Sequence, residues 1–252
     1  MIVETHVHLF DARYGADREE MIKRAEAAGV AKFINVSAEP AEARKVAAFD
    51  RQGVYKAIGL HPHNADEYSE AVYDEMKMLF KTKKSMVAVG EIGLDYYKST
   101  TPKALQEEVF RKFLGLAKEL DLPVLIHSRE AHADTYGILR EFNINKRGII
   151  HCFTGDIETA KKFSGDGYAI GIGGVITFPN AGVLRAAVAQ LPLENIVLET
   201  DAPWLAPQQM RGKRNEPAFL KYIVSAIAGI KGVTEREIEE VTTRNAERVF
   251  NI

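Results

Sequence analysis

Eight short apolar runs, each followed by a segment of helical periodicity, constrain the fold of this chain more than any other feature. The runs have the length of β-strands and are rich in Val, Ile and Leu, as expected of strands buried on both faces of a parallel sheet. We expect strands at 2–10, 31–37, 54–60, 85–90, 122–126, 148–150, 168–172 and 195–198. We expect helices at 17–28, 40–51, 66–80, 102–120, 131–142, 156–164 and 181–191, and two more at 216–230 and 234–250.

This alternation predicts a single (β/α)8 TIM barrel in which residues 1–252 form one α/β domain. An open doubly wound sheet is the competing architecture, but it would more naturally carry a G-x-G-x-x-G turn after an early strand, and this chain has none. The active site of a TIM barrel lies at the C-terminal ends of its strands, so the residues there are the candidates for function.

Composition bounds the location and the partners. The single cysteine, Cys152, excludes an internal disulfide framework and fits a reducing compartment. No run resembles a signal peptide or a membrane span, so we expect a cytoplasmic protein with no membrane contact, and a monomer unless an interface shows otherwise. The formal net charge of -2 offers no general attraction for nucleic acid, so an anionic substrate would need a local basic loop or a bound cation.

Histidines and carboxylates gather at the predicted strand ends. They are His6 and His8 on the first strand, His61 and His63 after the third, Glu91 after the fourth, His127 after the fifth, His151 after the sixth and Asp201 after the eighth. Each one alone has an ordinary structural interpretation, such as a hydrogen-bonded core histidine or a turn carboxylate. Together they would ring one mouth of the barrel, which predicts a metal site at the C-terminal ends of the strands.

This set exceeds what one zinc ion needs and suits two divalent ions bridged by a carboxylate. The expected ligands are His6, His8 and Asp201 for one ion, His127 and His151 for the other, and Glu91 as the bridge. Such a pair of ions polarises a phosphoryl or carbonyl oxygen and lowers the pKa of a bound water, which gives hydroxide near neutral pH. We expect Asp201 to act as the general base beside that water.

With these residues in place, the chain resembles the TatD family of metal-dependent deoxyribonucleases, within the amidohydrolase-type metal barrels. The resemblance covers nearly the whole length and rests on seven ordered blocks, ETHVH at 4–8, GLHPH at 59–63, GEIGLDY at 90–96, PVLIHSR at 123–129, HCFTG at 151–155, ETDAP at 199–203 and RGKRNEP at 211–217. It implies the same six ligands, magnesium or manganese with zinc as an alternative, and DNA phosphodiesters as substrate, cleaved from single-stranded ends by 3′-to-5′ exonuclease action. Glu4 departs from the family pattern, which usually has Asp two residues before the first histidine.

The candidates for substrate contact are His63, Arg129, Arg211, Lys213 and Arg214. His63 resembles a family position near the scissile phosphate, and the guanidinium of Arg129 has the geometry for bidentate phosphate binding. The basic cluster that follows the eighth strand has the charge to bind a nucleic-acid backbone. Trp204 and either Tyr96 or Tyr97 are candidates for stacking on an unpaired base. Hydrogen-bonded turns, ion pairs, solvated loops and core packing are the corresponding structural alternatives.

Two other functions stay open. An amidohydrolase of a small-molecule ester, lactone or cyclic amide would use a similar centre, although such barrels commonly bridge their metals with a carboxylated lysine where this chain has Glu91. A metal-bound barrel that serves only as a binding subunit is the second alternative. A complete ligand set with an added acid/base group argues against it.

Overall fold

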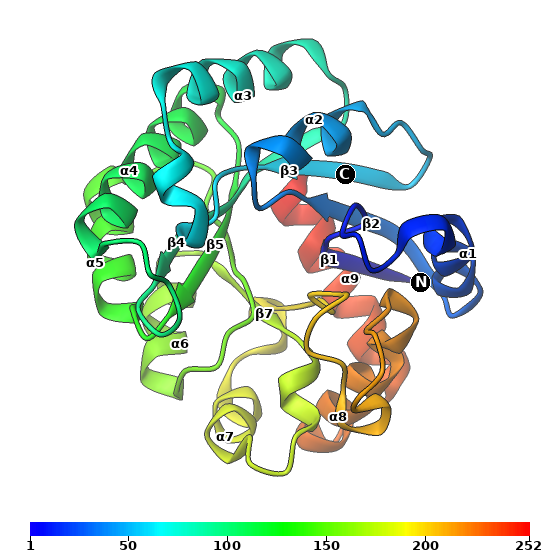
Figure 1. The fold of residues 1–252 in the computed structure, drawn as a ribbon. Helices are drawn as coiled ribbons and strands as arrows, with labels where there is room; N and C mark the ends of the chain where they lie inside the picture. Colours follow the sequence, from blue (N-terminus) through cyan, green and yellow to red (C-terminus); the bar gives the residue numbers. More distant parts are fainter.

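The computed structural model describes residues 1–252, in which eight strands pair in chain order as one parallel sheet curved into a barrel (Figure 1). The predicted TIM barrel is therefore confirmed. The strands are β1 Ile2–Val7, β2 Val30–Val36, β3 Val54–Ile58, β4 Met86–Asp95, β5 Val124–Arg129, β6 Gly148–Ile150, β7 Ala169–Ile172 and β8 Ile196–Leu198.

Helices surround the barrel, and the last helix, α9, lies across its N-terminal end (Figure 1). The helices are α1 Arg18–Ala27, α2 Pro40–Ala48, α3 Glu70–Thr82, α4 Lys103–Leu120, α5 His132–Phe142, α6 Ile157–Gly165, α7 Gly182–Gln190, α8 Leu220–Lys231 and α9 Glu235–Phe250. Short 3-10 helices η1 to η6 occupy Gly15–Asp17, Pro62–Glu67, Gly174–Thr177, Leu193–Asn195, Gln208–Met210 and Pro217–Phe219. None of these helices is both long and apolar enough to cross a membrane.

Apolar side chains fill two clusters that leave only one end of the barrel open. The larger cluster lies between the strands and the surrounding helices. The smaller cluster fills the barrel interior, where Val3, Leu125 and Val197 pack with Ala246 and Phe250 of α9. Because α9 closes the N-terminal end, the C-terminal ends of the strands form the accessible mouth.

The barrel closes between β1 and β8 through a few contacts rather than a full ladder. The N–H of His8 donates to the carbonyl of Ala202 at 2.9 Å, and the N–H of Asp201 donates to the carbonyl of His6 at 3.1 Å. A single parallel bridge joins Val7 and Ala202. The seam that closes the barrel thus also sets the relative positions of three predicted metal ligands.

The main differences from the sequence-based expectations lie at the ends of elements. β4 continues to Asp95 rather than ending at residue 90, because its backbone keeps pairing with β5 up to the Asp95–Arg129 pair. Glu91 therefore lies within a strand, whereas β1 ends at Val7 instead of residue 10. The helix expected at 66–80 begins at Glu70, because the Ser69 hydroxyl caps it by accepting the N–H of Val72 at 3.2 Å.

Candidate metal centre

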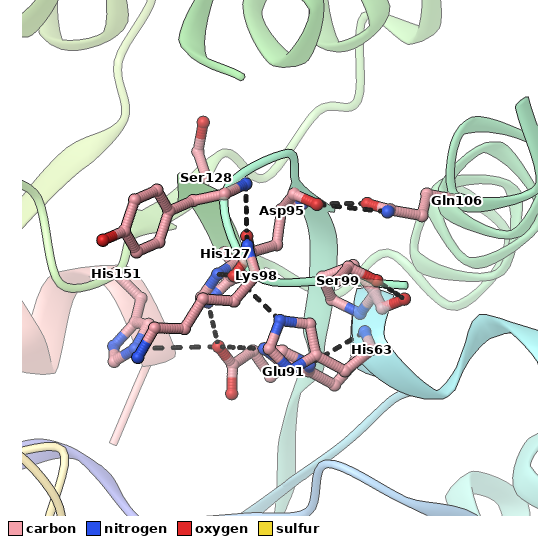
Figure 2. A network of polar contacts seen from close by, with 12 residues as sticks. His63, Glu91, Asp95, Lys98, Ser99, Gln106, His127, Ser128 and His151 are labelled. Carbon is pink, nitrogen blue, oxygen red and sulfur yellow. Dashed lines mark hydrogen bonds and ion pairs between the residues drawn. The ribbon is translucent and has the colours of Figure 1, made fainter. Parts of the chain in front are cut away.

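Glu91 is buried at the centre of the site, and its two carboxylate oxygens contact different histidines. Figure 2 shows the oxygen that contacts His127 and His151. Its Oε2 lies 3.3 Å from Nε2 of His6 and 3.8 Å from Nε2 of His8. Its Oε1 lies 2.8 Å from Nδ1 of His127 and 3.6 Å from Nε2 of His151. This division of the two oxygens is the geometry that a bridging carboxylate needs.

Asp201 completes the first group of candidate ligands. Its Oδ1 lies 3.5 Å from Nε2 of His8 and 3.8 Å from Nε2 of His151. The residue lies three positions after the end of β8 and has φ +57°, a left-handed conformation that Asp adopts more readily than most residues. His6, His8 and Asp201, the three residues expected to share one ion, each offer one atom to a group compact enough to hold an ion.

Three more compact groups are present, namely His61 with Glu91 and His127, His6 with His151 and Glu199, and His151 with Cys152 and Asp201. The expected second set, His127 and His151 with Glu91, is not among them, because His61 rather than His151 groups with His127 and Glu91. Nε2 of His61 lies 3.6 Å from Oε1 of Glu91, the same separation as for Nε2 of His151. His61 was not among the expected ligands, although its position at the end of the third strand placed it with the other candidate histidines.

For each histidine, the hydrogen bond made by the ring nitrogen facing away from the site shows whether the other nitrogen can bind a metal or donates a hydrogen bond. Nδ1 of His8 lies 3.2 Å from the carbonyl oxygen of Val36, which can only accept, so Nδ1 carries a proton and Nε2 is the nitrogen whose lone pair faces the site once His8 is neutral. His61 is the reverse case, because its Nδ1 accepts the N–H of His63 at 3.1 Å. Neutral His61 therefore directs an Nε2–H donor toward Glu91, which suits a substrate oxygen better than a cation.

Two further carboxylates orient candidate ligands, and the sequence analysis assigned no role to either. Oδ2 of Asp95 lies 3.1 Å from Nε2 of His127, and Oε1 of Glu199 lies 3.1 Å from Nδ1 of His151. Both carboxylates are buried. Carboxylates in this position fix the ring tautomer of a metal-binding histidine and raise its basicity.

Asp95 is also the hub of a wider network (Figure 2). Its Oδ2 lies 2.9 Å from Nε2 of His63, and its Oδ1 accepts the N–H groups of Tyr97 and Lys98, each at 2.9 Å. Asp95 therefore ties the candidate ligand His127 to His63, whose side chain is 41% exposed at the mouth.

The buried carboxylates of the centre favour additional positive charge beside them. Burial by itself would raise the pKa of Glu91, but His61, His6 and His151 hold that pKa well below its usual value. Burial opposes protonation of His8 and His151, yet Asp201 raises the pKa of His8 to about 9 and Glu199 raises the pKa of His151 to about 10. The buried carboxylates thus retain protons on histidines when no cation is present.

The donor set therefore fits divalent cations. Nε2 of His6 and Nε2 of His8 are 3.2 Å apart, and Nε2 of His8 faces the space that they share with Glu91 and Asp201. Neutral imidazoles and carboxylates are ligands of Zn, Mn and Fe, and carboxylates also bind Mg. A cation there would replace the shared protons and leave the carboxylates paired.

Glu4 joins the metal centre to the barrel seam. Its buried Oε1 accepts the N–H of His6 at 3.1 Å and the N–H of Thr200 at 2.9 Å, and its Oε2 lies 2.6 Å from the Thr200 hydroxyl. Burial raises the pKa of Glu4 to about 8, although the three hydrogen bonds lower it. The longer side chain at this position thus spans from β1 to the residues after β8.

The basic residues predicted to contact substrate are either exposed or already paired with carboxylates. Arg129, Arg211 and Lys213 are exposed near the mouth. Arg214 differs, because its guanidinium pairs with Asp17 and, at 2.7 Å, with Glu216. A phosphate would have to displace these carboxylates, so the observed role of Arg214 is to tie loops together.

Comparisons with known proteins agree with this geometry. Residues 3–251 match the family model described as TatD related DNase. The Bacillus subtilis protein described as uncharacterized metal-dependent hydrolase YabD is 40% identical over 255 residues, which span 100% of both chains. The Erwinia tasmaniensis protein described as 3′-5′ ssDNA/RNA exonuclease TatD is 36% identical over 255 residues, 98% of each chain. The crystal structure of YjjV, a TatD homologue from Escherichia coli K12, has a TM-score of 0.96 and 32% identity, covering 100% of this chain and 98% of that one.

The resemblance seen in the sequence is thereby confirmed over nearly the whole chain. The family match, the relatives named as metal-dependent hydrolases and the clusters of His, Glu and Asp able to hold metals all agree. This chain belongs to the TatD family of metal-dependent hydrolases.

Proposed function

We propose that this protein is a deoxyribonuclease that hydrolyses phosphodiester bonds and shortens single-stranded DNA from its 3′ end. The observation that carries the proposal is the placement of Glu91, whose two oxygens face separate groups of candidate ligands. Such a centre suits in-line displacement at phosphorus, where charge develops on both the attacking and the leaving oxygen. A relative named 3′-5′ ssDNA/RNA exonuclease TatD supports the choice of substrate and polarity.

We propose two divalent ions, magnesium or manganese, with His6, His8 and Asp201 holding one, His127 and His151 the other, and Glu91 both. When bound, the ions would polarise the phosphoryl group and lower the pKa of water at the site. Contacts with Val36, Asp95 and Glu199 orient the rings of His8, His127 and His151, so these ligand atoms need little rearrangement.

The side chains of the chain divide the remaining work. The ion pair with His8 lowers the pKa of Asp201 despite its burial, so Asp201 is a carboxylate at neutral pH and serves as the general base for the attacking water. His61 directs its Nε2–H at the same space and donates to a phosphoryl oxygen. His63, held by Asp95, and the exposed Arg129 bind the phosphate from the solvent side, together with Arg211 and Lys213.

The test is hydrolysis of single-stranded DNA carrying a label at either the 3′ or the 5′ end. Metal-stripped protein is refilled separately with Mg, Mn and Zn, and Glu91→Ala and Asp201→Ala are compared with wild type. Glu240→Ala is the matched control, because Glu240 is an exposed carboxylate on α9 at the opposite end of the barrel. We expect stepwise shortening from the 3′ end that both site variants lose and the control retains.

Each other outcome has a definite meaning. Turnover that survives in folded Glu91→Ala or Asp201→Ala would overturn the assignment of the catalytic centre. Absence of cleavage with every metal would favour the alternative function, hydrolysis of a small-molecule ester, lactone or cyclic amide by the same family fold.

A further inference from the structure

Two exposed aromatic side chains stand at the mouth of the barrel, outside the metal centre. Trp204 follows β8 and is 46% exposed, and Tyr97 follows β4 and is 59% exposed. Each of these aromatic side chains would bury extensive apolar surface if a ligand covered it. Both residues lie in the loops that carry substrate specificity in TIM barrels.

An arginine covers one face of each ring. The guanidinium carbon of Arg13 lies 3.2 Å from the centroid of the Trp204 ring, and that of Arg129 lies 4.3 Å from the centroid of Tyr97. The ammonium of Lys98 lies 5.9 Å from the same tyrosine ring. Each unit thus presents a flat π surface beside a positive charge, which matches a nucleotide, a flat base joined to an anionic phosphate.

The backbones of both aromatic residues are tied to the metal centre. The N–H of Trp204 donates to the carbonyl of Asp201 at 2.8 Å, and the side-chain amide of Asn215 donates to the carbonyl of Trp204. The N–H of Tyr97 donates to Oδ1 of Asp95 at 2.9 Å. The backbone of each residue is therefore fixed relative to the candidate ligands, although its ring projects into solvent.

The two units face each other across the mouth. In a ring of eight strands paired in chain order, β4 and β8 are four positions apart and so lie opposite one another. A strand spacing of about 4.8 Å and a tilt of about 36° give a barrel about 15 Å across. At about 3.4 Å per nucleotide for stacked bases, that width corresponds to about four nucleotides. Glu91 and its histidines lie between the two units.

We propose that Trp204 with Arg13 and Tyr97 with Arg129 are two base-stacking platforms that hold one nucleic-acid strand across the mouth, on either side of the scissile phosphate. The proposal rests on the proposed nuclease function and adds how the substrate is chosen. Stacking requires a free base face, which an unpaired strand offers and the interior of a duplex does not. The platforms therefore select single strands long enough to reach both sides.

The test uses the fact that Trp204 is the only tryptophan, so its fluorescence reports on one platform. Metal-loaded protein is mixed by stopped flow with a single-stranded octanucleotide, or with an abasic strand of the same length and charge, and emission is recorded before turnover. We expect quenching and tight binding with the normal strand. With the abasic strand we expect no quenching and a Kd weaker by at least about 30-fold, because both platforms lose a stacked base.

Variants separate the platforms from the chemistry. Tyr97→Ala should raise the KM for the octanucleotide by at least about fivefold with little change in kcat. Its hydrolysis of methyl 4-nitrophenyl phosphate, which is too small to reach either platform, should fall by less than its kcat/KM for the octanucleotide. Met78→Ala removes a side chain of similar exposure on α3, away from the mouth, and should change neither substrate.

The outcomes for the platforms and for the nuclease function are distinguishable. Equal quenching and equal Kd with the abasic strand, or a Tyr97→Ala variant that behaves like Met78→Ala, would overturn the stacking proposal while leaving phosphodiester hydrolysis in place. Base-dependent quenching without hydrolysis of either substrate would instead support the platforms and refute the nuclease function.

Discussion

The buried carboxyl of Glu4 provides a test of how the centre is built, through Glu4→Gln in metal-stripped protein. Burial raises the pKa of Glu4 to about 8, so this side chain is protonated in the folded protein at pH 7. A glutamine keeps the shape and can still accept the N–H groups of His6 and Thr200 while donating to the Thr200 hydroxyl. We expect the variant to fold and to keep the barrel seam.

The magnitude follows from proton linkage. A carboxyl of usual pKa 4.5 costs about 3 kcal/mol to protonate at pH 7, and wild-type protein bears this cost on folding, whereas the glutamine variant does not. Because the folded pKa is raised, the contribution of Glu4 is fully present below pH 4.5 and is lost as pH rises toward about 8. Glu4→Gln should therefore gain stability relative to wild type by about 1.4 kcal/mol per pH unit between pH 5 and pH 8.

Urea denaturation of both proteins across this pH range measures the difference directly. Glu4→Ala is the matched control, because it also removes the titratable carboxyl group but leaves the partners of Glu4 without hydrogen bonds. At about 1–3 kcal/mol for each unpaired group, it should be less stable than Glu4→Gln by at least about 3 kcal/mol. A Glu4→Gln variant that is less stable than wild type at pH 7, with a difference that does not change with pH, would show that Glu4 is ionised and that this reasoning is wrong.

Two further predictions concern the cation itself. Glu199→Gln should weaken metal binding by about 10- to 100-fold in a competition with a chelating dye, because His151 loses the carboxylate that orients it; unchanged affinity, as expected for the control Glu240→Gln, would contradict that role. Metal-free protein should lose stability as pH rises from 7 to 10. The pKa is raised to about 9 for His8 and to about 10 for His151 in the folded protein. Their contribution to stability is therefore complete below pH 6.5 and is lost as pH rises through these folded values. Metal-loaded protein should lack this decline in urea denaturation, since the cation replaces the protons, and an equal decline in both forms would argue against a cation at these histidines.

The position of the candidate metal centre was predictable from the sequence because a parallel barrel brings all strand ends to one rim. Histidines and carboxylates at those ends, such as His6, His127 and Glu91, had to converge once the eight strands were recognised. The roles of Asp95 and Glu199 were not accessible in the same way. They depend on which ring nitrogen each histidine turns inward, and residue spacing carries no information on that.

Long-range pairing explains the other differences. Arg214 was predicted to contact substrate as one of three cations in a loop, but its partner Asp17 is 197 residues away in the sequence. The end of β4 was placed too early because Glu91 interrupts the apolar run, although backbone pairing with β5 does not depend on side-chain polarity. In both cases a contact with a distant part of the chain, which the local sequence pattern does not show, decides the structure.

The most direct test of the central claim replaces a non-bridging oxygen of the scissile phosphate with sulfur. If bound cations held by the Glu91 centre contact that oxygen, the phosphorothioate strand should be cleaved much more slowly than normal DNA with Mg, and cleavage should recover with the more thiophilic Mn or Cd. Wild-type protein and the control Glu240→Ala should behave alike. Equal slowing by sulfur with every metal would contradict the claim that cations at this centre act on the phosphoryl group.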